Sequence, residues 1–319
     1  MNSENYEAVN QDRADETGRA AAQPTEASSP APSSLLVRNQ GQTNPEPAKD
    51  DRQADVRSQR RTRVLSVLNR KGGVGKTTTA FNLAGSLAAE GHPVLLIDMD
   101  PMGSLCRSLQ IRPGEKTLSD VLVGINHSLG ELIRPTQLKN LYVIPGDPDL
   151  RTFEMRHGGS VGYRDALERA LDEVLRIKPF PFVVIDCPPS LGLISGNALT
   201  ASSEVIVPVD GSTYGMGALV DTFRVIKLVR ENVNDKLRVC GVLLNNVDMG
   251  TVYDKTVRDV LGQQFGRLIF KSVIPTSPEA DVCSQKGIPV MQCEPTSWMA
   301  KAYAQLVQEV IAREPVFGN

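Results

Sequence analysis

The residues with the clearest chemical purpose lie between positions 69 and 78, in the stretch NRKGGVGKTT. A phosphate-binding loop needs glycines whose backbone amides face the anion, a lysine for the outer phosphate oxygens, and a hydroxyl for Mg²⁺. All of these groups are present, as Gly72, Gly73, Gly75, Lys76 and Thr77. The glycine that usually opens such a loop is replaced by Arg70. The stretch therefore predicts a phosphate-binding loop with an altered start.

Carboxylates follow two apolar stretches and complete the chemistry of a nucleoside triphosphatase. FVVIDCPP ends an apolar run at Asp186, the arrangement in which a carboxylate holds a water of the Mg²⁺ shell. VLLIDMDPMGS carries Asp98 and Asp100, for which we expect different roles. One would face the metal and phosphates, and the other would orient a water or order the following turn. Alternatively, either residue caps a helix over SLCRSL.

A dinucleotide-binding fold is the main rival interpretation of the same glycines. Gly73 and Gly75 open a helix, and Asp98 lies where a ribose-binding acid would stand. The third glycine of that pattern is missing, because its place is taken by Thr78. A lysine followed by a threonine also has no role in holding a pyrophosphate without metal. The pattern favours a P-loop.

Short β-branched runs alternate with longer amphipathic stretches from Val64 onward, which is typical of βαβ units. We expect a doubly wound α/β fold, with a mostly parallel sheet covered by helices on both faces. The expected strands are 64–68, 93–98, 141–144, 182–186, 204–208, 238–245 and 268–274. The expected helices are 77–90, 164–176, 216–231, 251–265 and 298–312.

The first 60 residues are polar and rich in Ala, Pro, Ser and Gln, with Tyr6 as their one aromatic residue. Such a composition predicts a disordered tail, whose basic end includes Arg57, Arg60 and Arg61, followed by one domain over 61–319. The N-terminus lacks the apolar segment of a signal peptide, and no run of about 18 apolar residues predicts a membrane span.

Whole-chain charge and cysteine content narrow the possible partners and the compartment. The net charge of -2 gives no global basic field, so any binding to nucleic acid must use a local patch. The five cysteines lack CxxC spacing, which argues against a disulfide framework or a thiolate metal site. We expect a cytoplasmic protein, with Cys187 as a small buried core residue.

The motifs together resemble the ParA/Soj members of the ParA/MinD family, which are ATPases with a deviant phosphate loop. The likeness covers roughly residues 63–312 and rests on KGGVGKTTTAFNLA, VLLIDMDPMGS, VVIDCPPSLG, NALTASSEVIVPV and GVLLNNVD, in the family's order. It implies an ATP-dependent homodimer that hydrolyses ATP slowly, with Mg²⁺, when a ParB-like or cargo-adaptor protein stimulates it. Such a protein positions a plasmid, chromosome or protein complex by nonspecific DNA binding, and is associated with the nucleoid.

The resemblance also implies residue roles. Lys71 reaches the phosphates of the other subunit, Asp100 positions the attacking water, and Thr77 and Asp186 hold magnesium. Lys71, Lys76 and Asp100 are the implied catalytic residues. The implied nucleotide contacts are Lys71, Gly72, Gly73, Val74, Gly75, Lys76, Thr77, Thr78 at the α-phosphate, and Asn245 or Asn246 with Pro275 at the adenine. An ordinary strand-ending turn is the alternative for the two asparagines.

The chain departs from the family pattern at two places. Met102 replaces a glutamine, and the segment after VIP lacks an arginine that relatives use for DNA. A replacement basic surface is expected from residues that recur along the C-terminal half, where a solvated helix face is the alternative. These residues are Arg224, Lys227, Arg230, Lys255, Arg258 and Lys271.

A MinD-like membrane-surface ATPase is a second possible function, but the end AYAQLVQEVIAREPVFGN has no basic amphipathic face.

Overall fold

A computed structural model describes residues 62–125, 127–248 and 252–313. Within these ranges, every strand and helix expected from the sequence is present, with small shifts at the ends. The tail expected over residues 1–60 lies outside the described residues, and so do Arg57, Arg60 and Arg61 of its basic end. Arg63 opens the first strand, where its guanidinium binds the buried Glu204.

The described residues form an eight-stranded sheet in the order β3-β4-β2-β5-β1-β6-β7-β8. Neighbouring strands are parallel, except for β3 beside β4. The strands are β1 Arg63–Val67, β2 Val94–Asp98, β3 Arg134–Pro135, β4 Leu141–Ile144, β5 Phe182–Asp186, β6 Glu204–Val209, β7 Arg238–Val247 and β8 Ile269–Pro275. The doubly wound, mostly parallel sheet predicted from the sequence is confirmed.

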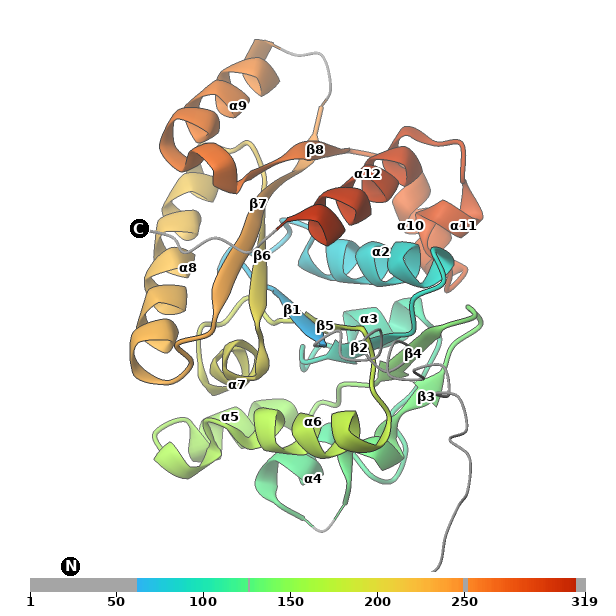
Figure 1. Cartoon of the computed structure of the whole chain (residues 1–319), viewed down its shortest axis with the longest axis vertical. Helices are drawn as coiled ribbons and strands as arrows, with labels where there is room; N and C mark the ends of the chain where they lie inside the picture. Colours follow the sequence, from blue (N-terminus) through green and yellow to red (C-terminus); the bar gives the residue numbers. More distant parts are fainter. Residues whose placement is uncertain (1–61, 126, 249–251, 314–319) are drawn as a thin grey trace, which may run out of the picture. The chain divides into compact units, whose positions relative to one another are not determined.

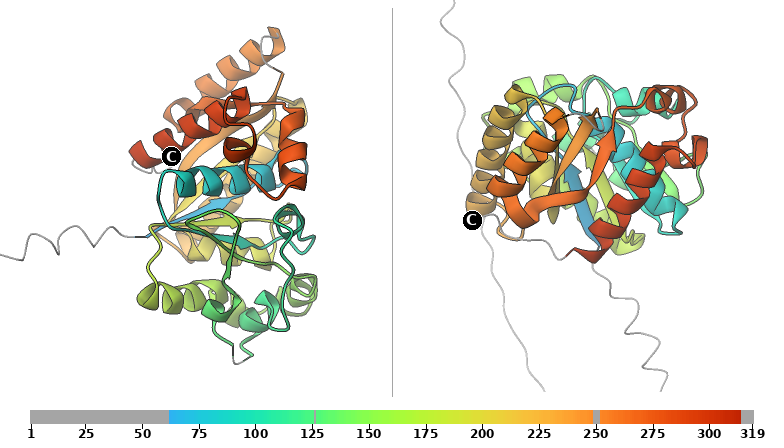
Figure 2. Two further views of the ribbon diagram at one scale, coloured as in Figure 1. Left: turned by 90° about the vertical axis from the view of Figure 1, so that its right-hand side faces the viewer. Right: turned by 90° about the horizontal axis from the view of Figure 1, so that it is seen from above.

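Helices cover both faces of the sheet (Figures 1 and 2). On one face lie α2 Lys76–Ala89, α3 Ser104–Ser108, α10 Pro278–Gln285, α11 Val290–Cys293 and α12 Trp298–Ala312. On the other lie α4 Leu118–Val123, α5 Leu150–His157, α6 Ala166–Ile177, α7 Leu193–Ala201, α8 Thr213–Asn232 and α9 Val252–Phe265. Side chains of β1 alternate between these faces, so that Leu65 packs toward α2 and Val64 toward the other layer.

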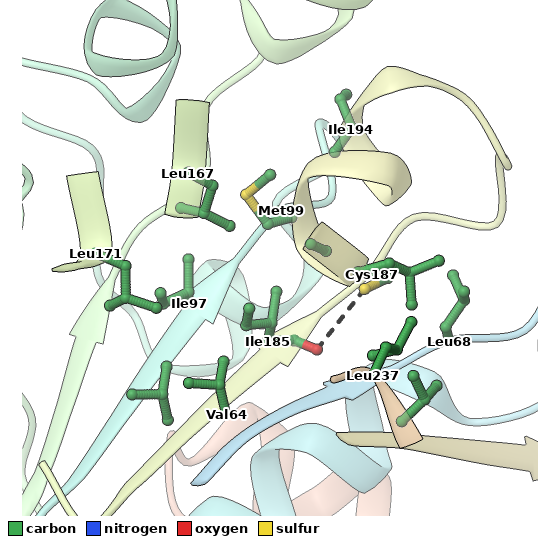
Figure 3. Close-up of a cluster of buried hydrophobic side chains, with 14 of the residues drawn as sticks. Val64, Leu68, Ile97, Met99, Leu167, Leu171, Ile185, Cys187, Ile194 and Leu237 are labelled. Atoms are coloured by element: carbon green, nitrogen blue, oxygen red, sulfur yellow. Dashed lines mark hydrogen bonds between the residues drawn. The ribbon is translucent and has the colours of Figure 1, made fainter. Parts of the chain in front are cut away.

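A large hydrophobic cluster fills the layer beneath α6 and α7, and Figure 3 shows part of it. Cys187 lies inside this cluster and is fully buried, with its thiol directed at the carbonyl oxygen of Ile185. Burial raises the pKa of this thiol, which keeps it protonated. The expected role of Cys187 as a small core residue is confirmed.

The outer edge of the sheet at β8 is held by a carboxylate from α12. Glu309 accepts hydrogen bonds from the backbone amides of Lys271 and Ser272, and from the Ser272 hydroxyl. Burial opposes ionisation of Glu309, but the Ser272 hydroxyl and these amides outweigh it and keep the pKa below its ordinary value. Satisfied amides on an edge strand leave fewer donors for pairing with another chain.

One expectation about the cysteines is wrong. Cys283 of α10 and Cys293 of α11 are joined in a disulfide, with their Cα atoms 5.7 Å apart. The scattered spacing concealed the pair, because the turn between the two short helices brings residues ten positions apart together. Cys106, Cys187 and Cys240 are buried and free.

Candidate nucleotide-binding site

The phosphate loop leaves β1 at the point where the strand order reverses, between β5 and β6. In open α/β sheets, ligands bind beyond the carboxyl ends of the strands at such a point. Gly75 ends the loop with φ of 82° as the N-cap of α2, a backbone conformation that favours glycine. A Cβ atom built on Gly75 would lie 2.1 Å from the Asn245 amide nitrogen. Only glycine fits at this position without displacing the end of β7.

Two asparagines at the end of β7 hold the backbone of the loop. The Nδ2 group of Asn245 donates to the carbonyl of Val74 at 2.8 Å, and that of Asn246 donates to the carbonyl of Gly73 at 3.1 Å. Asn245 is buried, and its Oδ1 atom has no hydrogen-bond partner among the described residues. Pro275, at the end of β8, lies opposite Val247 in the register of the sheet. The adenine contacts expected of these residues remain a prediction.

Lys76 is the lysine that the loop itself encloses. It is 7% exposed, and its ammonium donates to the carbonyl of Lys71 at 2.9 Å. Burial lowers the pKa of this ammonium, and the carboxylate of Asp186 opposes the shift. The charge lies at the N-terminus of α2, where unpaired amides and the helix dipole also favour an anion.

Asp186, at the end of β5, has the surroundings of a metal-binding carboxylate. It is fully buried, and neither of its oxygens has a hydrogen-bond partner among the described residues. Burial and the charge of Asp98 raise its pKa well above the ordinary value, and the nearby Thr77 hydroxyl opposes this rise. An unpaired buried carboxylate is unfavourable unless a cation compensates it. Oxygen donors of this type suit Mg²⁺, so Asp186 and Thr77 fit that ion.

Asp98 and Asp100 have different surroundings. Asp98 is fully buried and accepts hydrogen bonds from the amide of Asp100 at 3.0 Å and the amide of Cys106 at 3.2 Å. It therefore orders the turn and serves the first turn of α3 as a cap would. Burial raises its pKa to about 6. Asp100 is half-buried and accepts from the amide of Met102 at 2.9 Å.

The other lysine of the motif, Lys71, is bound by residues that follow β6. Its ammonium forms an ion pair with Asp210 and donates to the Ser212 hydroxyl at 2.7 Å. Burial opposes ionisation of Asp210, but the bond from Lys71 outweighs it and holds the pKa of that carboxyl below its ordinary range. Asp210 and Ser212 were not expected from the sequence. The only sequence signal for these two residues is that they come just after the carboxyl end of a parallel strand, β6.

Arg70, the residue in place of the usual glycine, joins the loop to α8. Its guanidinium forms an ion pair with Asp221, and its backbone amide donates to the Thr222 hydroxyl at 3.2 Å. The other oxygen of Asp221 accepts from Arg224 at 3.1 Å. One carboxylate therefore binds both a residue of the loop and a candidate DNA-binding residue.

The candidate DNA-binding residues are only partly brought together. Arg224 and Lys227 have exposed side chains on α8, where Asp221 and Glu231 respectively pair with them. A groove beside α8 is lined by Arg224, Lys227, Arg230 and Phe265, and Phe223 stacks on Phe265 of α9. Arg258 is on α9, and Lys271 is on β8. The side chain of Lys255 lies outside the described residues.

Comparisons with known proteins agree with this geometry. Residues 62–239 match a sequence-family model described as an AAA domain. The chain is 37% identical over 254 residues to the chromosome partitioning protein ParA of Caulobacter vibrioides, and the match covers 79% of this chain and 95% of that protein.

Two solved structures resemble this fold over most of their length. A cobyrinic acid a,c-diamide synthase from Mycobacterium smegmatis, with bound ATP analog and magnesium, is 31% identical with a TM-score of 0.68, over 77% of this chain and 93% of that chain. The septum site-determining protein MinD of Pyrococcus horikoshii, complexed with Mg-ADP, is 28% identical with a TM-score of 0.64, over 79% of this chain and 96% of that one.

The comparisons and the site point to the same family. The phosphate loop carries two lysines with separate partners, and carboxylates follow β2 and β5 at the carboxyl edge of the sheet. A parallel sheet reverses its order at that loop. The chain belongs to the ParA/MinD family of deviant P-loop ATPases and resembles its ParA/Soj members.

Proposed function

We propose that this chain is an ATP-switched dimer that partitions cargo along DNA. The observation that carries the proposal is the separation of the two lysines. Lys76 lies inside its own loop, whereas Lys71 is bound by Asp210 and Ser212. Lys76 is therefore placed for the phosphates of its own subunit, and we assign Lys71, which would exchange Asp210 for them, to the phosphates of a second subunit. Binding of ATP then favours the dimer, because it brings an anion to which both subunits contribute a cation.

The residues of this chain have distinct tasks in hydrolysis. Lys76 and the amides of the loop bind the phosphates and orient them. Thr77 and Asp186 would hold Mg²⁺, which when bound neutralises charge on the phosphate oxygens. Asp100 would orient the attacking water, and Asp98 fixes the turn that carries it. Lys71 would add positive charge where charge develops in the transition state.

Nonspecific DNA is the proposed surface along which the dimer moves. Arg224 and Lys227 are exposed on α8, and phosphate contacts from such residues give salt-sensitive binding without sequence preference. A ParB-like or cargo-adaptor protein would stimulate hydrolysis and end DNA binding. This cycle places the protein in the cytoplasm and on the nucleoid.

Partitioning is favoured over a membrane-surface function. The ParA relative is 37% identical to this chain, compared with 28% for the MinD structure. Separately, none of the described helices is long and apolar enough to cross a membrane, and binding at a membrane surface would not require one.

The test compares two lysine variants with the wild type. We expect Lys71→Ala to bind ATP through Lys76 but to remain monomeric with ATP, as measured by light scattering. Lys76→Ala should lose ATP binding itself, as measured by calorimetry, because it removes a charge-assisted contact worth roughly 1.5–3 kcal/mol. An ATP-dependent dimer of Lys71→Ala would contradict the proposed division of labour.

A further inference from the structure

The disulfide between Cys283 and Cys293 joins two short helices beside the phosphate loop. The two Cα atoms are 5.7 Å apart, within the range that a disulfide requires. Cys283 belongs to α10 and Cys293 to α11. Cys106, Cys187 and Cys240 are buried and form no disulfide. The pair is therefore the place where oxidation would form a bond within this part of the chain.

The two sulfur atoms differ in access and in charge environment. Cys283 is 1% exposed, whereas Cys293 is half-buried. The ammonium of Lys286 lies 4.0 Å from the sulfur of Cys293. A neighbouring cation favours the thiolate, which is the form that attacks an oxidant. Cys293 thus has the features of an attacking thiol, and the buried Cys283 those of a resolving thiol.

α10 lies opposite the first turn of α2, which carries Thr77 and Thr78 of the candidate site. A pocket of about 40 Å³ separates Cys283, Ala280 and Asp281 from Thr77 and Thr78. This volume admits about three water molecules.

On the α11 side, the amide of Val290 donates to the side chain of Asn82 at 2.8 Å, and Asn82 donates to the carbonyl of Thr78 at 2.8 Å. The disulfide therefore ties α10 to a helix that is hydrogen-bonded to α2 on the other side of the pocket.

Few other contacts fix α10. Cys283 is the one fully buried residue of this helix. Two hydrogen bonds join α10 to the region of α3. One is between Ser284 and Ser108 at 2.6 Å, and the other runs from Gln110 to the carbonyl of Gln285 at 2.9 Å. With the disulfide open, α10 depends on the packing of Cys283 and Ala280 and on these two hydrogen bonds.

We propose that Cys283 and Cys293 are a reversible thiol–disulfide site through which a peroxide weakens nucleotide binding. The Cys293 thiolate attacks hydrogen peroxide and becomes a sulfenic acid, with release of hydroxide. The Cys283 thiol then attacks that sulfur, a sulfur–sulfur bond forms, and water leaves. A dithiol reverses the step by exchange and becomes oxidised to its own disulfide.

The effect on nucleotide follows from the narrow pocket. We place the ribose next to Thr78, where the pocket of about 40 Å³ between α2 and α10 is too small to hold it unless α10 moves outward. The disulfide restrains this movement because α11 is tied to Asn82. Oxidised protein therefore binds ATP more weakly, and reduced protein binds it more tightly. This inference rests on the proposed binding of ATP at the loop.

The test measures the affinity of a fluorescent ATP analogue with Mg²⁺ for the full chain, once reduced with dithiothreitol and once oxidised with hydrogen peroxide. The bond is mapped separately by mass spectrometry of peptides that contain Cys283 and Cys293. We expect the oxidised chain to bind at least about fivefold more weakly, the lower end of ordinary coupling between two sites. Dithiothreitol should restore the affinity.

Two variants serve as controls. Cys293→Ser, at a half-buried position, should bind the analogue equally with either treatment, whereas Cys240→Ala should keep the response of the wild type. The proposal is overturned if peroxide forms no bond between the two peptides, if bonded protein binds as well as reduced protein, or if Cys293→Ser still responds. If the reduced wild type does not bind the analogue, the proposed ATP site is contradicted, and the proposed effect of the disulfide on ATP binding falls with it. Mass spectrometry still shows, independently, whether the disulfide forms.

Discussion

The carboxylates of the candidate site are distinguished by their surroundings rather than by their types. Asp98, Asp100 and Asp186 all follow strands at one edge of the sheet, yet only Asp98 is saturated by backbone and thiol donors. Asp186 is buried with unpaired oxygens, and Asp100 is half-buried. A saturated carboxylate holds structure, whereas an unsaturated one is available for a ligand. The sequence alone indicated that Asp98 and Asp100 differ, but not which of them orders the turn.

At Asp100, removal of the carboxylate should separate binding from hydrolysis. We expect Asp100→Ala to bind ATP as the wild type does, because Asp100 is not part of the loop that holds the phosphates. Turnover should fall by about 100-fold or more, the ordinary contribution of a group that manages a proton or a water. Phosphate release and analogue binding, measured on the same preparation, check this. Unchanged turnover would refute the role given to Asp100.

Glycine at position 75 is required by both conformation and space. Gly75→Ala would combine φ of 82° with a Cβ atom 2.1 Å from Asn245. We expect a loss of about 1–3 kcal/mol in the free energy of unfolding, together with weaker ATP binding. Gly196→Ala is the matched control, because Gly196 lies in α7 and has open space around it. Urea unfolding and calorimetry measure the two effects. Equal stability of the two variants would contradict the tight fit at Gly75.

At the scale of elements, the edge strand β8 depends on an ionised Glu309. A depressed pKa means that the folded chain favours the ionised form, so the contribution of Glu309 to stability is complete above its unfolded value and declines as pH falls. The ordinary pKa of a glutamate side chain is 4.5. We expect Glu309→Gln to be less stable than the wild type near pH 7, and the difference to shrink below about pH 4.5. Urea unfolding at several pH values checks this, and a difference that grows toward acid would contradict it.

Elements with a clear apolar pattern were predictable, and the shortest ones without such a pattern were not. The strands β2, β5 and β6 are rich in apolar residues, and helices such as α6 and α12 show clear amphipathic spacing, so both kinds appear in the sequence pattern. The two-residue strand β3 contains Pro135, and α11 has only four residues. Neither is long enough to show a period. The disulfide and the Lys71–Asp210 pair depend on tertiary placement, which local pattern does not encode.

At the scale of the whole molecule, DNA binding should depend on ATP and on salt. We expect nonspecific duplex binding, measured by fluorescence anisotropy, to require ATP and to weaken steeply as salt rises. Removing Arg224 and Lys227 together should lower the slope of log affinity against log salt by roughly two. Arg169→Ala is the matched control, since Arg169 is an exposed, ion-paired arginine on α6. No binding at low salt with ATP present would refute the DNA surface.

Asp221 connects the proposed binding sites for ATP and for DNA. Its two oxygens bind Arg70 of the phosphate loop and Arg224 of the proposed DNA-binding surface. If DNA phosphates draw Arg224 away, Asp221 is left with Arg70 alone. The free energy of the loop conformation that Arg70 holds then changes. Thermodynamic linkage then requires reciprocity: the factor by which ATP tightens DNA binding equals the factor by which DNA tightens ATP binding. The nucleic acid would act as an effector of the ATPase as well as its track.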